Sequence, residues 1–149
     1  MNVTRITAIH EAAHAVAAIR AGLVFDFVTA IPDDELELDG ELHWTDLTAL
    51  GTVVESPHLH AVVLLAGPCA EARERGLRAD RVFSGVAASG DREAVASLGL
   101  DEEQFLAATR EALALIERDW AVIERVAAEL ELGYDLEFEE VEEIVNGNS

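Results

Sequence analysis

The sequence predicts an α+β fold that is predominantly helical, formed by a single domain over residues 1–149. Three observations lead to this prediction. Apolar residues recur at helical spacing over much of the second half of the chain, and short stretches in the first half are rich in Val, Phe and Ile. In addition, neither a repeat nor a linker divides the 149 residues, a length that suits one core. We therefore expect a small strand or hairpin layer between an N-terminal helix and a C-terminal helical bundle.

Composition and end signals predict the elements of the first half. An Ala-rich segment should form a helix that ends at Gly22, because glycine commonly caps helices. Stretches rich in Val, Phe and Ile favour short strands. Pro57 should stand in the first turn of a second helix, and Pro68 should kink that helix because it removes a backbone hydrogen bond. In chain order, we expect a helix over 4–21, strands over 23–31, 41–45 and 52–55, and a helix over 56–76.

The second half should be helical. We expect a short helix over 91–98, one long amphipathic helix or two in tandem from Asp101 onward, and a short acidic helix over 137–145. The apolar residues of the long segment alternate at spacings of four and three, which lays one stripe on the core. These stripe residues are Phe105, Thr109, Leu113, Ile116, Trp120, Ile123, Ala127 and Leu130.

Composition limits the function classes. Ten basic and thirty acidic residues give a formal net charge of −20, which disfavours nucleic acids and anionic membranes as partners. All ten basic residues are Arg, and the lack of Lys excludes a Walker A phosphate loop and a Lys Schiff base. The longest purely apolar run, 61–66, is far shorter than the roughly 20 residues of a membrane span, and the first residues do not resemble a secretory signal. We therefore expect a cytoplasmic protein whose single cysteine, Cys69, is a buried thiol.

The most specific pattern is H-E-x-x-H, formed by His10, Glu11 and His14 inside the first expected helix. Residues four apart lie on one helix face, so both imidazoles can reach one metal ion. Glu11, next to the first imidazole, is suited to act as a general base toward a metal-activated water. The chain's own His and Glu frequencies yield only about 0.02 such matches by chance. The motif predicts a catalytic site with one zinc ion per chain, which needs a third protein ligand and an open fourth position.

Four segments together resemble the zinc peptidase domain of the FtsH-type (AAA-protease) family. HEAAHAVAAIRAG (10–22) resembles the HEAGHA helix of that family, and LLAGPCAE (64–71) resembles its apolar helix ending in GGR-x-AE. ASGDREAVASL (88–98) resembles its A-S-N-D-L segment, whose Asp is the third zinc ligand, and a W-x-x-I-x-x-V-A-x-x-L pattern occupies 120–130. The order of elements agrees, so the resemblance covers nearly the whole chain. It implies that Asp91 completes the metal site.

Some positions depart from the family pattern. Ala13 replaces the Gly of the motif, Pro68 stands where Arg is usual, and Arg92 replaces an apolar residue next to the implied third ligand. Glu71 is the alternative third ligand, because the family also has Glu there. For Glu71 we expect instead a hydrogen bond from one of the ligand histidines, since such histidines usually donate their second ring nitrogen to an acceptor.

The resemblance implies a zinc-dependent metallopeptidase that hydrolyses peptide bonds in a peptide or unfolded-protein substrate, with Glu11 as general base. The alternative is a catalytically inactive, peptidase-like domain that binds metal or a protein. In the family, an extended substrate pairs with an edge strand, for which 25–31 is the candidate here. The sequence contains neither the ATPase module nor the membrane anchor of that family. We therefore expect a free-standing domain, a homo-oligomer, or a domain that acts with a separate partner protein.

Three further histidines are weaker candidates. His58 and His60 are two residues apart, so on a helix they do not face one ion, and we expect both to be exposed at the start of the second helix. His43, beside Trp44 on the second expected strand, is a candidate hydrogen-bond donor to a transition state.

Overall fold

The computed structural model describes residues 5–23, 25–30, 41–44, 57–76 and 99–147. This part of the chain confirms the predicted, predominantly helical fold with a small strand layer. Its elements are α1 (Arg5–Ala21), β1 (Phe25–Thr29), β2 (Glu41–Trp44), α3 (Pro57–Arg75), α6 (Glu102–Glu131), β3 (Leu136–Glu137) and α7 (Phe138–Val145). None of the described helices combines the length and apolarity needed to cross a membrane. The strand expected over 52–55 and the helix expected over 91–98 lie outside the described residues.

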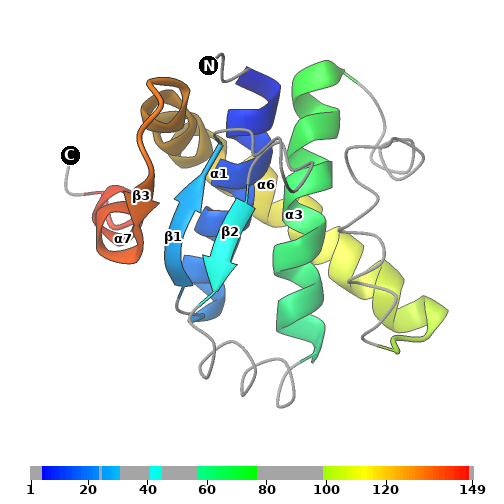
Figure 1. Ribbon diagram of the computed structural model, residues 1–149. Helices are drawn as coiled ribbons and strands as arrows, with labels where there is room; N and C mark the ends of the chain where they lie inside the picture. The colour runs from blue at the N-terminus through cyan, green and yellow to red at the C-terminus, as the bar shows by residue number, and fades with distance from the viewer. Residues whose placement is uncertain (1–4, 24, 31–40, 45–56, 77–98, 148–149) are drawn as a thin grey trace, which may run out of the picture.

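Helix α1 is the central element (Figure 1), with the sheet on one side, α6 on the other and α3 beside it. α3 runs antiparallel to α1, since Arg5 at the start of α1 binds Glu74 near the end of α3 whereas His14, further along α1, contacts Val63. Every residue of α1 over 8–18 is buried, so this helix is covered on all sides. A helix covered in this way needs small or apolar residues all round, which explains why α1 is rich in Ala and has no polar face.

Gly22 ends α1 as the sequence predicts. Its φ of +79° is a left-handed conformation that glycine adopts without a side-chain clash. The turn returns two hydrogen bonds to the helix, from the N–H of Gly22 to the carbonyl of Ile19 at 3.1 Å and from the N–H of Leu23 to that of Ala18 at 2.9 Å. Leu23 is therefore buried at the point where the chain turns toward β1.

The strand order β2–β1–β3 places β1 in the centre of the sheet. β1 pairs antiparallel with β2 on one side and with the two-residue β3 on the other. The prediction that 25–31 forms an edge strand is therefore wrong, because the C-terminal segment supplies a second neighbour. A register shift between Phe25 and Phe27 lets Phe25 and Val28 both face the core, which explains the loose alternation of this stretch.

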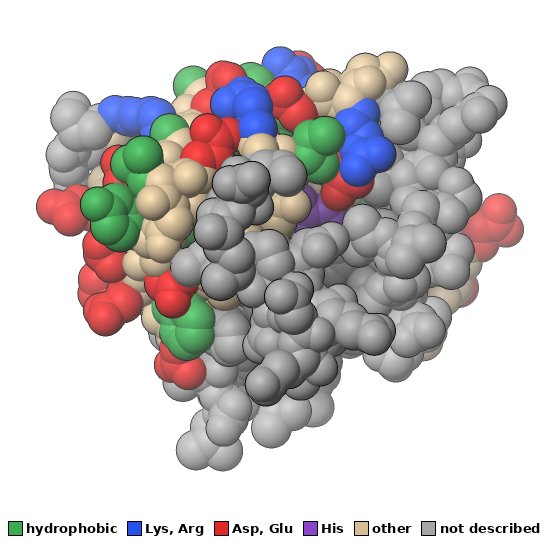
Figure 2. Space-filling view, turned by 45° about the horizontal axis from the view of Figure 1, so that its top comes forward, with side chains coloured by type: hydrophobic (Ala, Val, Ile, Leu, Met, Phe, Trp, Pro, Cys, Tyr) green, Lys and Arg blue, Asp and Glu red, His purple; other side chains and the backbone are tan. Residues whose placement is uncertain are grey.

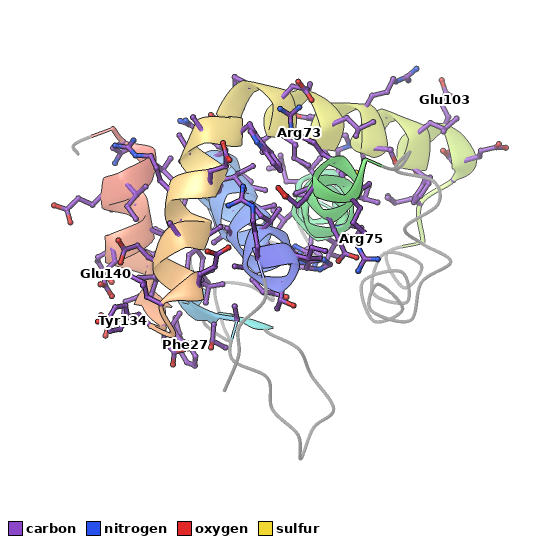
Figure 3. All side chains as sticks on the ribbon, turned by 90° about the horizontal axis from the view of Figure 1, so that it is seen from above. Phe27, Arg73, Arg75, Glu103, Tyr134 and Glu140 are labelled. Carbon is purple, nitrogen blue, oxygen red and sulfur yellow. The ribbon has the colours of Figure 1, made fainter. Side chains whose placement is uncertain are left out.

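Helix α6 is continuous over 30 residues, but Asp119 has non-helical dihedral angles (φ −104°, ψ 17°). The two parts of α6 point in different directions (Figure 3), so both forms of the prediction, one long helix and two in tandem, describe part of the result. The helix begins with a capping box in which Asp101 and Gln104 bond each other's backbone N–H groups. The buried Asp119 carboxylate accepts hydrogen bonds at 3.2 and 3.0 Å from Arg20 of α1, which fixes the bend against the central helix.

Candidate metal centre

His10, Glu11 and His14 are polar residues in the otherwise apolar buried part of α1. Their exposed fractions are 6%, 7% and 5%, respectively. Burying a polar side chain costs free energy unless it has hydrogen-bond partners, so each of these residues requires a polar environment. For the two histidines, hydrogen-bond partners come from α3, the neighbouring helix.

His10 is hydrogen-bonded to Glu71 of α3. The distance between His10 Nδ1 and Glu71 Oε1 is 2.9 Å, and Glu71 is only 5% exposed. The other oxygen, Glu71 Oε2, lies 3.2 Å from Nη2 of Arg75, one helical turn further along α3. The hydrogen bond between Glu71 and a motif histidine, expected from the sequence, is therefore present. Both carboxylate oxygens of Glu71 have a partner in this arrangement.

His14 is held by the backbone of α3. Its Nδ1 lies 2.8 Å from the carbonyl oxygen of Val63. A carbonyl oxygen can only accept, so His14 Nδ1 is the N–H donor, and in the neutral ring Nε2 then carries the lone pair. The same assignment follows for His10 if Glu71 is a carboxylate acceptor. In both rings the Nδ1 bond leaves Nε2 as the nitrogen suited to bind a metal ion.

Gly67 shows where the two Nε2 atoms point. A Cβ placed on Gly67 would lie 2.3 Å from His14 Nε2 and 2.8 Å from His10 Nε2, closer than van der Waals contact allows. The two imidazole rings, whose centroids are 4.8 Å apart, therefore face one common space directly beside the Gly67 backbone. Only glycine leaves this space open, so we interpret Gly67 as the residue that lets α3 approach both rings.

These residues fit a zinc ion on chemical grounds. The two imidazoles are four residues apart, and each has Nδ1 bonded to an acceptor and Nε2 facing a shared space. This arrangement is typical of a pair of histidine ligands in a zinc site. Glu71 contacts His10 at Nδ1, the ring nitrogen opposite the one that faces Gly67. Asp91 lies outside the described residues, and within the described part no group of three or more His, Cys, Asp or Glu side chains is arranged to hold a metal.

The remaining histidines lie in different surroundings. His58 pairs with Glu111 of α6, whereas His60 is half-buried and lies near His14. Burial, followed by the proximity of His14, lowers the pKa of His60 below its usual value. The expectation that His60 is exposed is therefore wrong, because the side of α3 that carries it faces α1. The backbone of His43 lies in β2 as predicted, but its side chain is outside the described residues.

Sequence reasoning missed three contributors to this centre: the Val63 carbonyl, Gly67 and Arg75. A backbone carbonyl leaves no mark in a sequence. Gly67 stands inside an apolar helix, where glycine is unfavourable, and this placement is a signal of close backbone approach. Arg75 lies four residues after Glu71, a spacing typical of a helical ion pair.

Figure 2 shows a histidine side chain at the surface, next to acidic and Arg side chains. The chain matches no protein-family model, and no curated protein is significantly similar to it. The resemblance to the FtsH-like peptidase domain therefore rests on the sequence motifs alone.

Proposed function

We propose that the chain is a zinc-dependent metallopeptidase of the FtsH-like type, in which His10, His14 and Asp91 bind one zinc ion and Glu11 is the general base. The observation that supports this most strongly is the common orientation of the two Nε2 atoms toward the space beside Gly67. The role of Asp91 rests on the resemblance of its segment to the ligand segment of that family. The substrate would be a peptide or an unfolded protein.

The chain's own residues would act as follows. A bound zinc would lower the pKa of water to about 7 and polarise a peptide carbonyl. Glu11, adjacent to His10 on α1, would take one proton from the attacking water and deliver it to the leaving amine as the C–N bond breaks. Glu71 and the Val63 carbonyl hold the two imidazoles in place, so neither ring needs to reorient during the reaction.

The outer strand of the described sheet is a better candidate for substrate pairing than β1. β1 is paired on both sides, whereas β2 stands at the end of the strand order and contacts α1, the helix that carries the motif. An extended peptide added beside β2 would use backbone hydrogen bonds for affinity and would lie near the motif helix. We therefore propose that an extended substrate pairs with β2 rather than with β1.

Metal content provides the first test. The purified wild-type protein should contain about one zinc per chain by elemental analysis, and Asp91→Ala should bind it much more weakly because one of three protein ligands is lost. Zinc retained in Asp91→Ala would place the third ligand elsewhere. A wild-type protein that binds no zinc, even when zinc is supplied, would contradict the proposal.

The second test separates an enzyme from an inactive, peptidase-like binding domain. Glu11→Gln should reduce hydrolysis of a fluorescently labelled unfolded protein by about 1,000-fold while zinc content stays unchanged, because the amide cannot accept the proton. Glu103→Gln, an identical change at an exposed position of α6, is the matched control and should have wild-type activity. A zinc-containing wild type with no activity above that of Glu11→Gln would favour the inactive domain.

A further inference from the structure

We infer that Arg75 is a positioning residue for the metal centre, because it anchors Glu71 and thereby fixes the orientation and tautomer of His10. This inference rests on the proposed function only in so far as His10 is a zinc ligand. The contacts themselves are independent of that role. Arg75 lies outside the motif and outside the segments that resemble the FtsH-like family.

The contacts form a chain of three side chains. Arg75 Nη2 lies 3.2 Å from Glu71 Oε2, and Glu71 Oε1 lies 2.9 Å from His10 Nδ1. A guanidinium group can only donate, so Glu71 accepts at Oε2, and an ionised carboxylate accepts at Oε1 as well. His10 must then donate from Nδ1, which leaves Nε2 with the lone pair that faces Gly67.

The two motif histidines differ in what holds them, and this difference explains why one of them needs Arg75. The acceptor for His14 is a backbone carbonyl, whose position α3 itself fixes. The acceptor for His10 is a Glu side chain with several rotatable bonds, and such a side chain is held in one orientation only if its second oxygen is also bound. Arg75 supplies that second contact.

A purely structural explanation is available and makes a different prediction. Arg and Glu four residues apart on a helix commonly form a surface ion pair of small energetic value. Here, however, Glu71 is buried at 5% exposure and is shared with an imidazole, whereas Arg75 keeps 44% of its side chain exposed. If the pair were only a surface ion pair, its loss would not alter the ring of His10.

Arg73 is the matched control. It lies two residues before Arg75 on the same helix and has a similar side-chain exposure of 38%. Arg73 points to the opposite side of α3 (Figure 3), where it pairs with Glu117 and lies 4.4 Å from the centre of the Trp120 ring of α6. The changes Arg73→Gln and Arg75→Gln therefore remove the same charge from the same helix, but only one of them affects the contact to His10.

The decisive measurement is the tautomer of each histidine ring in the metal-free protein, from ¹⁵N chemical shifts at a pH where the rings are neutral. In wild type and Arg73→Gln, His10 should be predominantly the Nδ1–H form. In Arg75→Gln, a substantial fraction of His10 should change to the Nε2–H form, whereas His14 should not change. Arg75→Lys, which retains a donor of the same charge, should restore most of the wild-type spectrum.

Zinc affinity, measured by competition with a chelator, provides the functional readout. Arg75→Gln should bind zinc about tenfold more weakly than wild type, as expected when an outer partner of a metal ligand is disturbed. Arg73→Gln should remain within about twofold of wild type. An unchanged His10 tautomer in Arg75→Gln would overturn the inference, whatever the zinc affinity. If the wild type binds no zinc, the proposed function fails, while the tautomer measurement still decides the role of Arg75.

Discussion

Two buried carboxylates of this protein, Glu71 of α3 and Asp119 of α6, are stabilised in different ways. Asp119 accepts two hydrogen bonds from Arg20 and a third contact at 3.3 Å from Arg118, so its described partners are permanent cations. Glu71 is bound by the guanidinium of Arg75 and by the imidazole of His10. The second nitrogen of that imidazole faces the space beside Gly67. The contacts of Asp119 therefore end at the carboxylate, whereas those of Glu71 continue to a group that can bind a ligand.

The difference assigns a structural role to Asp119, where α6 contacts α1, and a role in the candidate metal site to Glu71, where α3 contacts α1. A buried carboxylate without partners is very costly, so both residues must be paired for the chain to fold. At Asp119 the pairing fixes the bend of α6 against α1. At Glu71 the pairing orients a candidate metal ligand. Substitutions on the two sides should therefore affect different measurements.

The largest effect on the metal centre is expected from Gly67→Ala. The added methyl group would occupy the space that both Nε2 atoms face, 2.3 Å from His14 Nε2, so the rings must move away from residue 67. Zinc affinity, measured by competition with a chelator, should fall by at least about 100-fold. The free energy of unfolding should fall by about 1–3 kcal/mol because of overpacking.

Gly22→Ala serves as the control for this substitution. Gly22 has a positive φ but nothing within 4 Å of an added Cβ, so alanine there strains only the backbone, by about 1 kcal/mol. Its zinc affinity should equal that of the wild type. Wild-type zinc affinity in Gly67→Ala would show that the metal binds elsewhere.

A large effect on stability without an effect on metal binding is expected from Asp119→Ala. The change removes the acceptor of Arg20, and the free energy of unfolding in urea should fall by about 2 kcal/mol. The loss stays below that of a fully buried pair because Arg20 is 38% exposed and can be hydrated. Glu117→Ala, two residues earlier and 68% exposed, should cost about 0.5 kcal/mol or less. Equal losses in the two variants would remove the distinction between Asp119 and a surface ion pair.

The sequence predicted the described helices well because their signals are local. Gly22, Pro57 and the capping residues around Asp101 mark the ends of helices within a few residues, and the observed ends differ from the expected ones by only one or two positions. The position of β1 in the sheet was predicted wrongly, since its second neighbour, β3, is only two residues long and comes from the far end of the chain. No local pattern reports such a pairing.

The candidate site was predictable only in part for the same reason. His10, Glu11 and His14 form a motif on one helix, so their proximity follows from helical spacing. The roles of the Val63 carbonyl and of Gly67 depend on how closely α3 packs against α1, which is a property of two elements together. His60 was misjudged for that reason too, because its exposure depends on which side of α3 faces α1.

The smallest expected effect concerns Cys69, a buried residue of α3 one helical turn before Arg73. Burial confirms the predicted packed thiol and raises its pKa from 9.0 to about 12. As pH rises above 9, the unfolded chain releases the thiol proton while the folded chain retains it, so stability should decline between pH 9 and 12. By pH 10 the decline should reach about 1 kcal/mol. The chain has no Lys and a single Tyr, so few other groups titrate in this range. Urea unfolding of wild type and Cys69→Ala from pH 7 to pH 10 should therefore give a steeper loss in the wild type. Parallel curves would contradict the raised pKa of the thiol.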